Sequence, residues 1–334
     1  MQFNPLIDTV ISIVLIYIIL SMLSSFILEL FAEANNLRGN LLRNKLKEIF
    51  HDPTNQTPNV GQLIYKHPLI KAMMYRKNRV PENINSNQFA EALNDIIKDI
   101  TEIGLMKQIK YDDKEIANKD NDKLSEIAKI NNTFRSIANS ELKYLYGAAY
   151  KIPDIDPPIQ DPEKYKEVFG NWFETLRMQL TIIYKRKTRL RLFIIGLLLA
   201  IIFKCDSIYL VKRLYTDEAM RTEFVNRAQT MVNNNSNGPI DSIMISNILE
   251  ANGSDKKFNE LSIAERTKIL YEHAGKLPIS RPLPAKGSAH AGDWIRMIFG
   301  IIISATAVIF GAPFWYDTLR KIVRLNDTVK TQQS

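Results

Sequence analysis

Residues 297–316 read MIFGIIISATAVIFGAPFWY, and the charged stretch DTLRKIVR follows at residues 317–324. The first stretch contains no charged residue, and about 20 residues at 1.5 Å each cover the roughly 30 Å hydrocarbon core of a bilayer. Trp315 and Tyr316 end the apolar run, and aromatic residues are common where a membrane helix meets the headgroups. Basic residues follow, which is typical of the cytoplasmic side. The pattern predicts a transmembrane helix over residues 294–316 with its carboxyl end inside the cell.

Two further apolar segments indicate that the chain enters the membrane more than once. They are Thr9–Leu28 and Leu192–Val211, and long polar stretches separate them. Elsewhere apolar residues recur at helical spacing, and the period-two alternation of strands does not persist. We therefore predict a mainly α protein with three transmembrane helices, a helical cytoplasmic domain and a smaller helical or irregular extracytoplasmic loop.

The spacing of the apolar segments predicts six regions along the chain, three with membrane helices and three exposed to water. The long helix of the third region is expected to rise from the cytoplasm through the membrane without a break. In order, the regions are an N-terminal transmembrane helix (1–32), a helical cytoplasmic domain (33–160), a long helix that includes the second transmembrane helix (161–215), an extracytoplasmic loop (216–293), the third transmembrane helix (294–316) and a cytoplasmic basic tail (317–334).

Basic residues beside the apolar segments set the predicted orientation. Arg38, Arg43 and Lys45 follow the first segment, and a denser basic cluster precedes the second. Because positive charge collects on the cytoplasmic side of a membrane, the N-terminus is expected outside and the C-terminus in the cytoplasm. The basic cluster is expected to contact anionic lipid headgroups, and no nucleic acid partner is expected despite the net charge of +8. The basic cluster comprises Lys185, Arg186, Lys187, Arg189 and Arg191.

Two charged residues interrupt the second apolar segment. Lys204 and Asp206 lie roughly 20 Å from its cytoplasmic end, a depth at which an unpaired charge is costly. Asp8 and Arg296 are expected at the same level on the other two helices, so the sequence predicts the ion pairs Lys204–Asp8 and Asp206–Arg296. Two interpretations stay open: a structural role through ion pairing and snorkelling, or a place on a conduction or proton-relay path.

Small residues recur at helix-packing spacing on the first and third apolar segments. In lipid such residues let helix backbones approach closely, so the pattern favours ordinary packing between helices over a pore lining. These faces comprise Ser21 and Ser25 on the first segment, and Gly300, Ser304 and Gly311 on the third. The anchor at the membrane surface is assigned to Pro313, Trp315 and Tyr316.

No sequence pattern typical of catalysis, cofactor binding or metal binding occurs in the chain. The phosphate-binding, dinucleotide-binding, zinc-protease and serine-hydrolase motifs are absent. The chain has one cysteine, Cys205, and four scattered histidines without the spacing of metal ligands. We therefore expect a protein that is not an enzyme and that binds no cofactor and no metal.

The C-terminal motif resembles one found in a bacterial family. Residues 311–319, GAPFWYDTL, are similar to the GAPFWFD-type ending of a family of poorly characterised integral membrane proteins. The resemblance extends to YKHPLI at 65–70, FAEAL at 89–93 and WFE at 172–174, and the chain departs from the family at Tyr316, where Phe is usual. The resemblance implies a multi-pass protein of the bacterial inner membrane and implies no activity.

These features favour two hypotheses of function. The first is a non-enzymatic anchor or scaffold whose helical cytoplasmic domain binds a protein partner or a second copy of the chain. The alternative is an oligomeric channel or membrane-disrupting effector that the cytoplasmic domain gates. Lys204 and Asp206 distinguish these two hypotheses. Ion pairs within one chain favour the scaffold, whereas side chains that line an axis shared by several subunits favour conduction.

Overall fold

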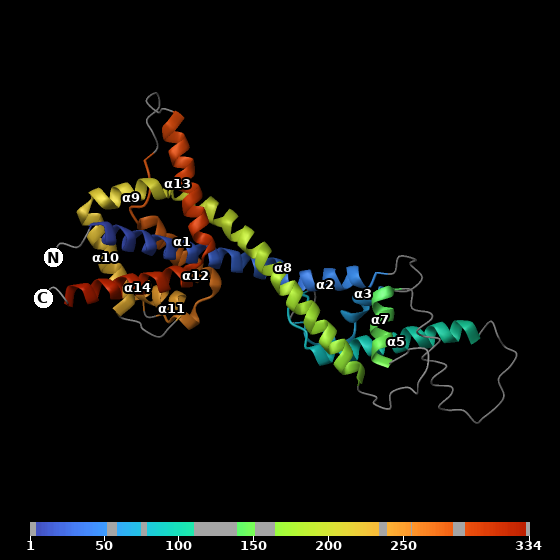
Figure 1. The fold of residues 1–334 in the computed structure, drawn as a ribbon. Coiled ribbons are helices and arrows are strands. Elements are labelled where there is room, and N and C mark those ends of the chain that lie inside the picture. Colours follow the sequence, from blue (N-terminus) through green and yellow to red (C-terminus); the bar gives the residue numbers. More distant parts are fainter. Residues whose placement is uncertain are drawn as a thin grey trace. The chain divides into compact units, whose positions relative to one another are not determined.

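The regular structure of this chain is helical throughout the part that the computed structural model describes (Figure 1). No strand occurs in these residues, which confirms the prediction of a mainly α protein. The chain divides into a split unit, formed by residues 1–34 and 186–334, and a middle unit, formed by residues 35–185. The described residues are 5–51, 59–74, 79–109, 139–150, 164–233, 239–254, 256–282 and 291–331.

The middle unit is held together by aromatic packing between helices that are far apart in the sequence. Its helices are α2 (Leu37–Ile49), α3 (Val60–Ile64), α4 (Pro68–Lys71), α5 (Ser86–Ile109), α7 (Ser140–Tyr150) and the first part of α8 (Lys164–Ile202). Phe89 of α5 stacks on Phe173 of α8 with ring centroids 4.1 Å apart, and Trp172 lies 5.4 Å from Phe50. Helical spacing of apolar residues explains this core, because it places Phe89 and Leu93 on the buried face of α5.

The split unit is built around α1 (Pro5–Asn35). This helix is apolar on every side, as helices buried in protein are, and Ile11, Ile18 and Leu23 have no exposed surface. The other elements of the split unit are the last part of α8, α9 (Ser207–Thr216), α10 (Glu218–Asn233), α11 (Ile240–Ala251), η1 (Phe258–Glu260), α12 (Ile263–Lys276), α13 (Ala291–Ile309) and α14 (Ala312–Thr331).

The segment predicted as an extracytoplasmic loop packs onto α1. Phe224 of α10, Ile245 of α11 and Leu270 of α12 are buried in the same core as α1. Leu319 and Val323 of α14 belong to this core as well, and α14 contacts both α10 and α11 (Figure 1). Helices α10 to α12 and α14 therefore share one core with the first helix.

Two described helices, α1 and α13, are long and apolar enough to cross a membrane. Helices α8 and α9 pass the same test together, with a bend of 52° between them, and make a third candidate if they are counted as one span. The uninterrupted helix predicted over residues 161–215 is therefore two helices, and residues 161–163 lie outside the described part of the chain. The physical reason is the turn at residues 203–206, whose contacts are given below.

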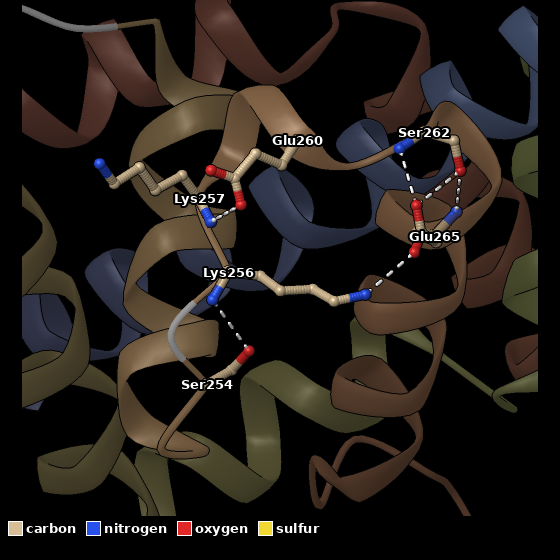
Figure 2. A network of polar contacts seen from close by, with 6 residues as sticks. All are labelled: Ser254, Lys256, Lys257, Glu260, Ser262 and Glu265. Carbon is tan, nitrogen blue, oxygen red and sulfur yellow. Dashed lines mark hydrogen bonds and ion pairs between the residues drawn. The ribbon is translucent and has the colours of Figure 1, made fainter.

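A reciprocal cap fixes the start of α12 (Figure 2). Ser262 Oγ accepts a hydrogen bond from the Glu265 backbone N–H at 3.3 Å, and the Glu265 carboxylate accepts one from the Ser262 N–H at 2.9 Å. Lys256 Nζ lies 3.3 Å from the same carboxylate. Because hydrogen bonds from Ser262 and the charge of Lys256 favour the ionised form, the pKa of Glu265 is held below its ordinary value. The cap thereby sets where α12 begins beside α11.

Candidate functional site

The charged interruption of the second apolar segment is a break between two helices. Helix α8 ends at Ile202 and α9 begins at Ser207. Between them Lys204 takes a left-handed backbone conformation with a φ of 50°, and the Cys205 N–H donates to the Ala200 carbonyl oxygen at 2.8 Å, which closes the end of α8. A left-handed residue other than glycine costs on the order of 1 kcal/mol, so the surrounding contacts must hold this turn.

Asp206 lies at the centre of the break. Its side chain is fully buried, and its Oδ1 accepts hydrogen bonds from the backbone N–H groups of Ile208 at 2.9 Å and Tyr209 at 3.1 Å, so it caps α9. Its Oδ2 forms an ion pair with Arg281, whose backbone N–H also donates to the Lys204 carbonyl oxygen at 3.0 Å. A helix N-terminus and one guanidinium of the same chain therefore compensate the buried charge.

Gly300 and Ser304 of α13 pack directly on this break. A Cβ on Gly300 would lie 1.7 Å from Asp206 Oδ1, so only glycine leaves room for the carboxylate. Ser304 Oγ lies 2.7 Å from Ser207 Oγ, which in turn lies 2.8 Å from the Tyr17 hydroxyl of α1. The small residues predicted to pack on the third segment thus contact the turn between α8 and α9, and buried hydroxyls join three helices there.

The two ion pairs predicted within the membrane are wrong. Asp206 pairs with Arg281, whereas Arg296 lies exposed on α13. In the described residues Lys204 contributes its backbone to the turn and forms no ion pair with Asp8, which is buried near the start of α1. Sequence reasoning missed Arg281 because it lies between the second and third apolar segments, far from both, in a stretch without helical periodicity that could mark it as a partner.

The remaining small residues occupy two different environments. Ser21 is fully buried in α1, and the half-buried Ser25 donates from its hydroxyl to the Ser21 carbonyl oxygen at 2.9 Å. Gly311 lies between α13 and α14 with a φ of 81°, a conformation that glycine adopts without steric cost. Gly311 therefore forms the turn that ends α13, and its assignment to a helix-packing face is corrected.

Pro313, Trp315 and Tyr316 begin α14 instead of ending a membrane helix. Pro313 lies in the first turn of α14, where a helix needs no N–H from that position. Trp315 Nε1 donates to the Ala307 carbonyl oxygen at 2.7 Å, and its ring centroid lies 4.9 Å from that of Tyr17. Tyr316 is buried in the same core. Both aromatic rings therefore contact protein, a role that the sequence analysis did not assign to them.

Apolar side chains remain exposed along α8, α9 and α13. Phe299 exposes 59% of its surface and Leu198 exposes 54%. Helices α8 and α13 lie close together, since a Cβ on Gly196 would lie 3.0 Å from the Val308 Cβ. An exposed apolar area of this kind is typical of a contact with lipid or with protein. This apolar surface comprises Ile194, Leu198, Ile201 and Ile202 of α8, Ile208 and Val211 of α9, and Ile295, Ile298, Phe299, Ile302 and Ile303 of α13.

The basic cluster precedes the apolar surface on the same helix. Along α8 a basic stretch passes within two turns into exposed apolar residues, a change typical of the boundary between headgroups and hydrocarbon. The cluster is open to solvent, since Lys185, Arg186, Lys187 and Arg189 are exposed and Arg191 is half-buried.

The chemistry of the break is that of hydrogen bonding and ion pairing. Cys205 is fully buried and free, and no group of three or more His, Cys, Asp or Glu residues in the described part of the chain is placed to hold a metal ion. The arrangement fixes a bend in an apolar helix and compensates the charge at its centre. No protein-family model, curated protein or solved structure matches this chain.

Proposed function

We propose that this protein is a non-enzymatic membrane protein that anchors or scaffolds a partner. The observation that carries the proposal is the pairing of Asp206 with Arg281 inside one chain. Both oxygens of the buried carboxylate are engaged, one by Arg281 and the other by the start of α9. A role in conduction requires a charge that a passing ion or proton can reach, so this geometry favours a structural role.

The apolar surface supports a place in the membrane. Burying a whole Leu, Ile or Phe side chain contributes about 1.5–3 kcal/mol, so each half-exposed side chain gains roughly 1 kcal/mol when lipid covers it. Helix α1 contributes little to this surface, because 78% of its most apolar window is buried inside the protein. We assign the lipid contact to α8, α9 and α13, and assign α1 to the core that supports them.

The middle unit is the part proposed to bind the partner, which is a protein or a second copy of the chain. Helix α8 belongs to both units: Phe169 and Phe173 lie in the core of the middle unit, and Leu199 and Ala200 lie in the core of the split unit. One continuous helix therefore connects the proposed partner-binding unit to the proposed lipid-binding surface. Anionic headgroups at the basic cluster, and a location in the bacterial inner membrane, complete the proposal.

The experiment that tests the proposal separates an anchor from a channel. The purified protein is reconstituted, its subunits are counted by mass photometry, and currents are recorded across planar bilayers. An anchor is expected as a monomer or dimer without conductance. A ring of four or more subunits, with currents that Asp206→Asn alters, would establish the channel instead and overturn the proposal.

The orientation in the membrane has its own test. The basic clusters predict that the N-terminus and residues 216–293 lie outside and that the tail lies inside. The core shared by α14, α10 and α11 instead favours a tail on the same side of the membrane as these helices. Topology reporters fused after Asn235 and after Ser334 decide between these two orientations, because they show on which side of the membrane each position lies. Opposite signals support the orientation from charge, and equal signals support the orientation from packing.

A further inference from the structure

The split unit contains a cavity of about 520 Å³ between α1, α10, α11 and α12. This volume lies within the range of about 300–1,000 Å³ that is usual for small-molecule sites. The cavity is separate from the helix break and shares no lining residue with it. The larger apolar residues of its lining include Leu15 and Ile19 of α1, Phe224 and Met231 of α10, and Met244 and Ile248 of α11.

Polar residues at this cavity are basic, amide-bearing or, at Thr230, hydroxyl-bearing. Arg227 of α10 and His273 and Lys276 of α12 line it, together with asparagine side chains, and no lining residue is Asp or Glu. Glu223 compensates Arg227 in part, since the two form an exposed ion pair at 2.5 Å. Burial holds the pKa of His273 below its ordinary value, and the nearby charges of Arg227 and Lys276 lower it further.

We propose that this cavity binds a single-chain amphiphile with an anionic head. The acyl chain lies against the apolar residues of α1, α10 and α11, and the head lies between Arg227 and Lys276. A carboxylate or a phosphate meets this chemistry equally, because both offer acceptor oxygens to a guanidinium and an ammonium group. A cationic head would be repelled, and a neutral head would gain no charge-assisted hydrogen bond from Arg227 or Lys276. The inference does not depend on the anchor role.

The test uses the full-length protein in nanodiscs of phosphatidylcholine, with empty nanodiscs as the blank. The probe is 11-(dansylamino)undecanoate, whose emission rises in an apolar site, and the competitors are decanoate, decyl phosphate, decanol and decyltrimethylammonium. We expect decanoate or decyl phosphate to displace the probe at a concentration at least about tenfold lower than decanol. The tighter of the two anions identifies the head group. Equal displacement by decanol or by the cation would overturn the proposal.

Matched variants locate the binding in the cavity. Arg227→Gln combined with Lys276→Gln is expected to weaken decanoate about tenfold and to leave decanol unchanged. The control combines Lys212→Gln with Lys268→Gln, which removes the same charge at exposed positions outside the cavity and should bind like the wild type. Thr230→Phe narrows the cavity and should weaken both competitors, which gives a second readout if the charge variant does not fold. Equal losses in the control, or unchanged binding in Thr230→Phe, would refute this location.

Discussion

Gly300→Ala is expected to destabilise the split unit, although it replaces glycine by a better helix former. At an unobstructed helix position this change stabilises by about 1 kcal/mol. At Gly300 the new Cβ would lie 1.7 Å from Asp206 Oδ1, so the carboxylate must move. Loss of the cap on α9 costs about 1 kcal/mol, and a buried charge that loses its partner costs about 3–5 kcal/mol. A displacement that weakens both interactions outweighs the gain in helix propensity and leaves a net loss of about 3 kcal/mol.

The assay is thermal unfolding of the protein in detergent, followed by circular dichroism. For a unit of this size 1 kcal/mol corresponds to about 2–4 °C, so Gly300→Ala should lower the midpoint by about 6–12 °C. Gly292→Ala is the control, because a Cβ at Gly292, on the same helix, meets nothing within 4 Å. Equal midpoints for the two variants would refute the argument that Gly300 is required by the Asp206 carboxylate.

Three further perturbations test other contacts. Trp315→Phe removes the hydrogen bond to the Ala307 carbonyl oxygen and should lower the free energy of unfolding by about 1 kcal/mol. An unchanged thermal midpoint would show that this hydrogen bond does not stabilise the protein. Ser262→Ala should destabilise α12 by about 1 kcal/mol, while Ser254→Ala, nearby in Figure 2 but outside the cap, should have little effect. The pKa of His273 in the folded protein lies below its unfolded value of about 6.5. As the pH falls below about 6.5, the unfolded state therefore binds a proton more readily than the folded state does. The stability contributed by the neutral side chain is lost in this range. The difference in unfolding midpoint between wild type and His273→Gln should therefore change between pH 7.5 and 5.5, and a constant difference would contradict it.

Local patterns in the sequence predicted the helices and their buried faces well. Phe89 and Leu93 are four residues apart, a spacing that puts two side chains on one face of a helix, and both are fully buried in the core of the middle unit. The sequence S-x-x-E at Ser262 predicts a capping box, and the structure has one. These features depend on residues within one or two turns of each other, so the sequence carries them directly.

Contacts between residues far apart in the sequence could not be predicted from the sequence patterns. Asp206 was assigned Arg296 because both were expected at one membrane depth, but the turn at Lys204 redirects the chain and brings Arg281 to the carboxylate. Depth in a membrane fixes one coordinate of a residue and leaves its neighbours undetermined. The segment that forms α10 was assigned to water because its composition is polar. Its buried side, with Phe224, nevertheless packs on α1.

The accessibility of a nitroxide label at Phe299 shows directly whether the apolar surface of α8, α9 and α13 lies in lipid. The label is placed in nanodiscs in a Cys205→Ala background, and its collisions with oxygen are compared with those with a water-soluble nickel chelate. A label at the exposed Lys268 of α12 provides the aqueous control. We expect high oxygen and low nickel accessibility at Phe299, and the reverse at Lys268. Equal nickel accessibility at the two positions would contradict it.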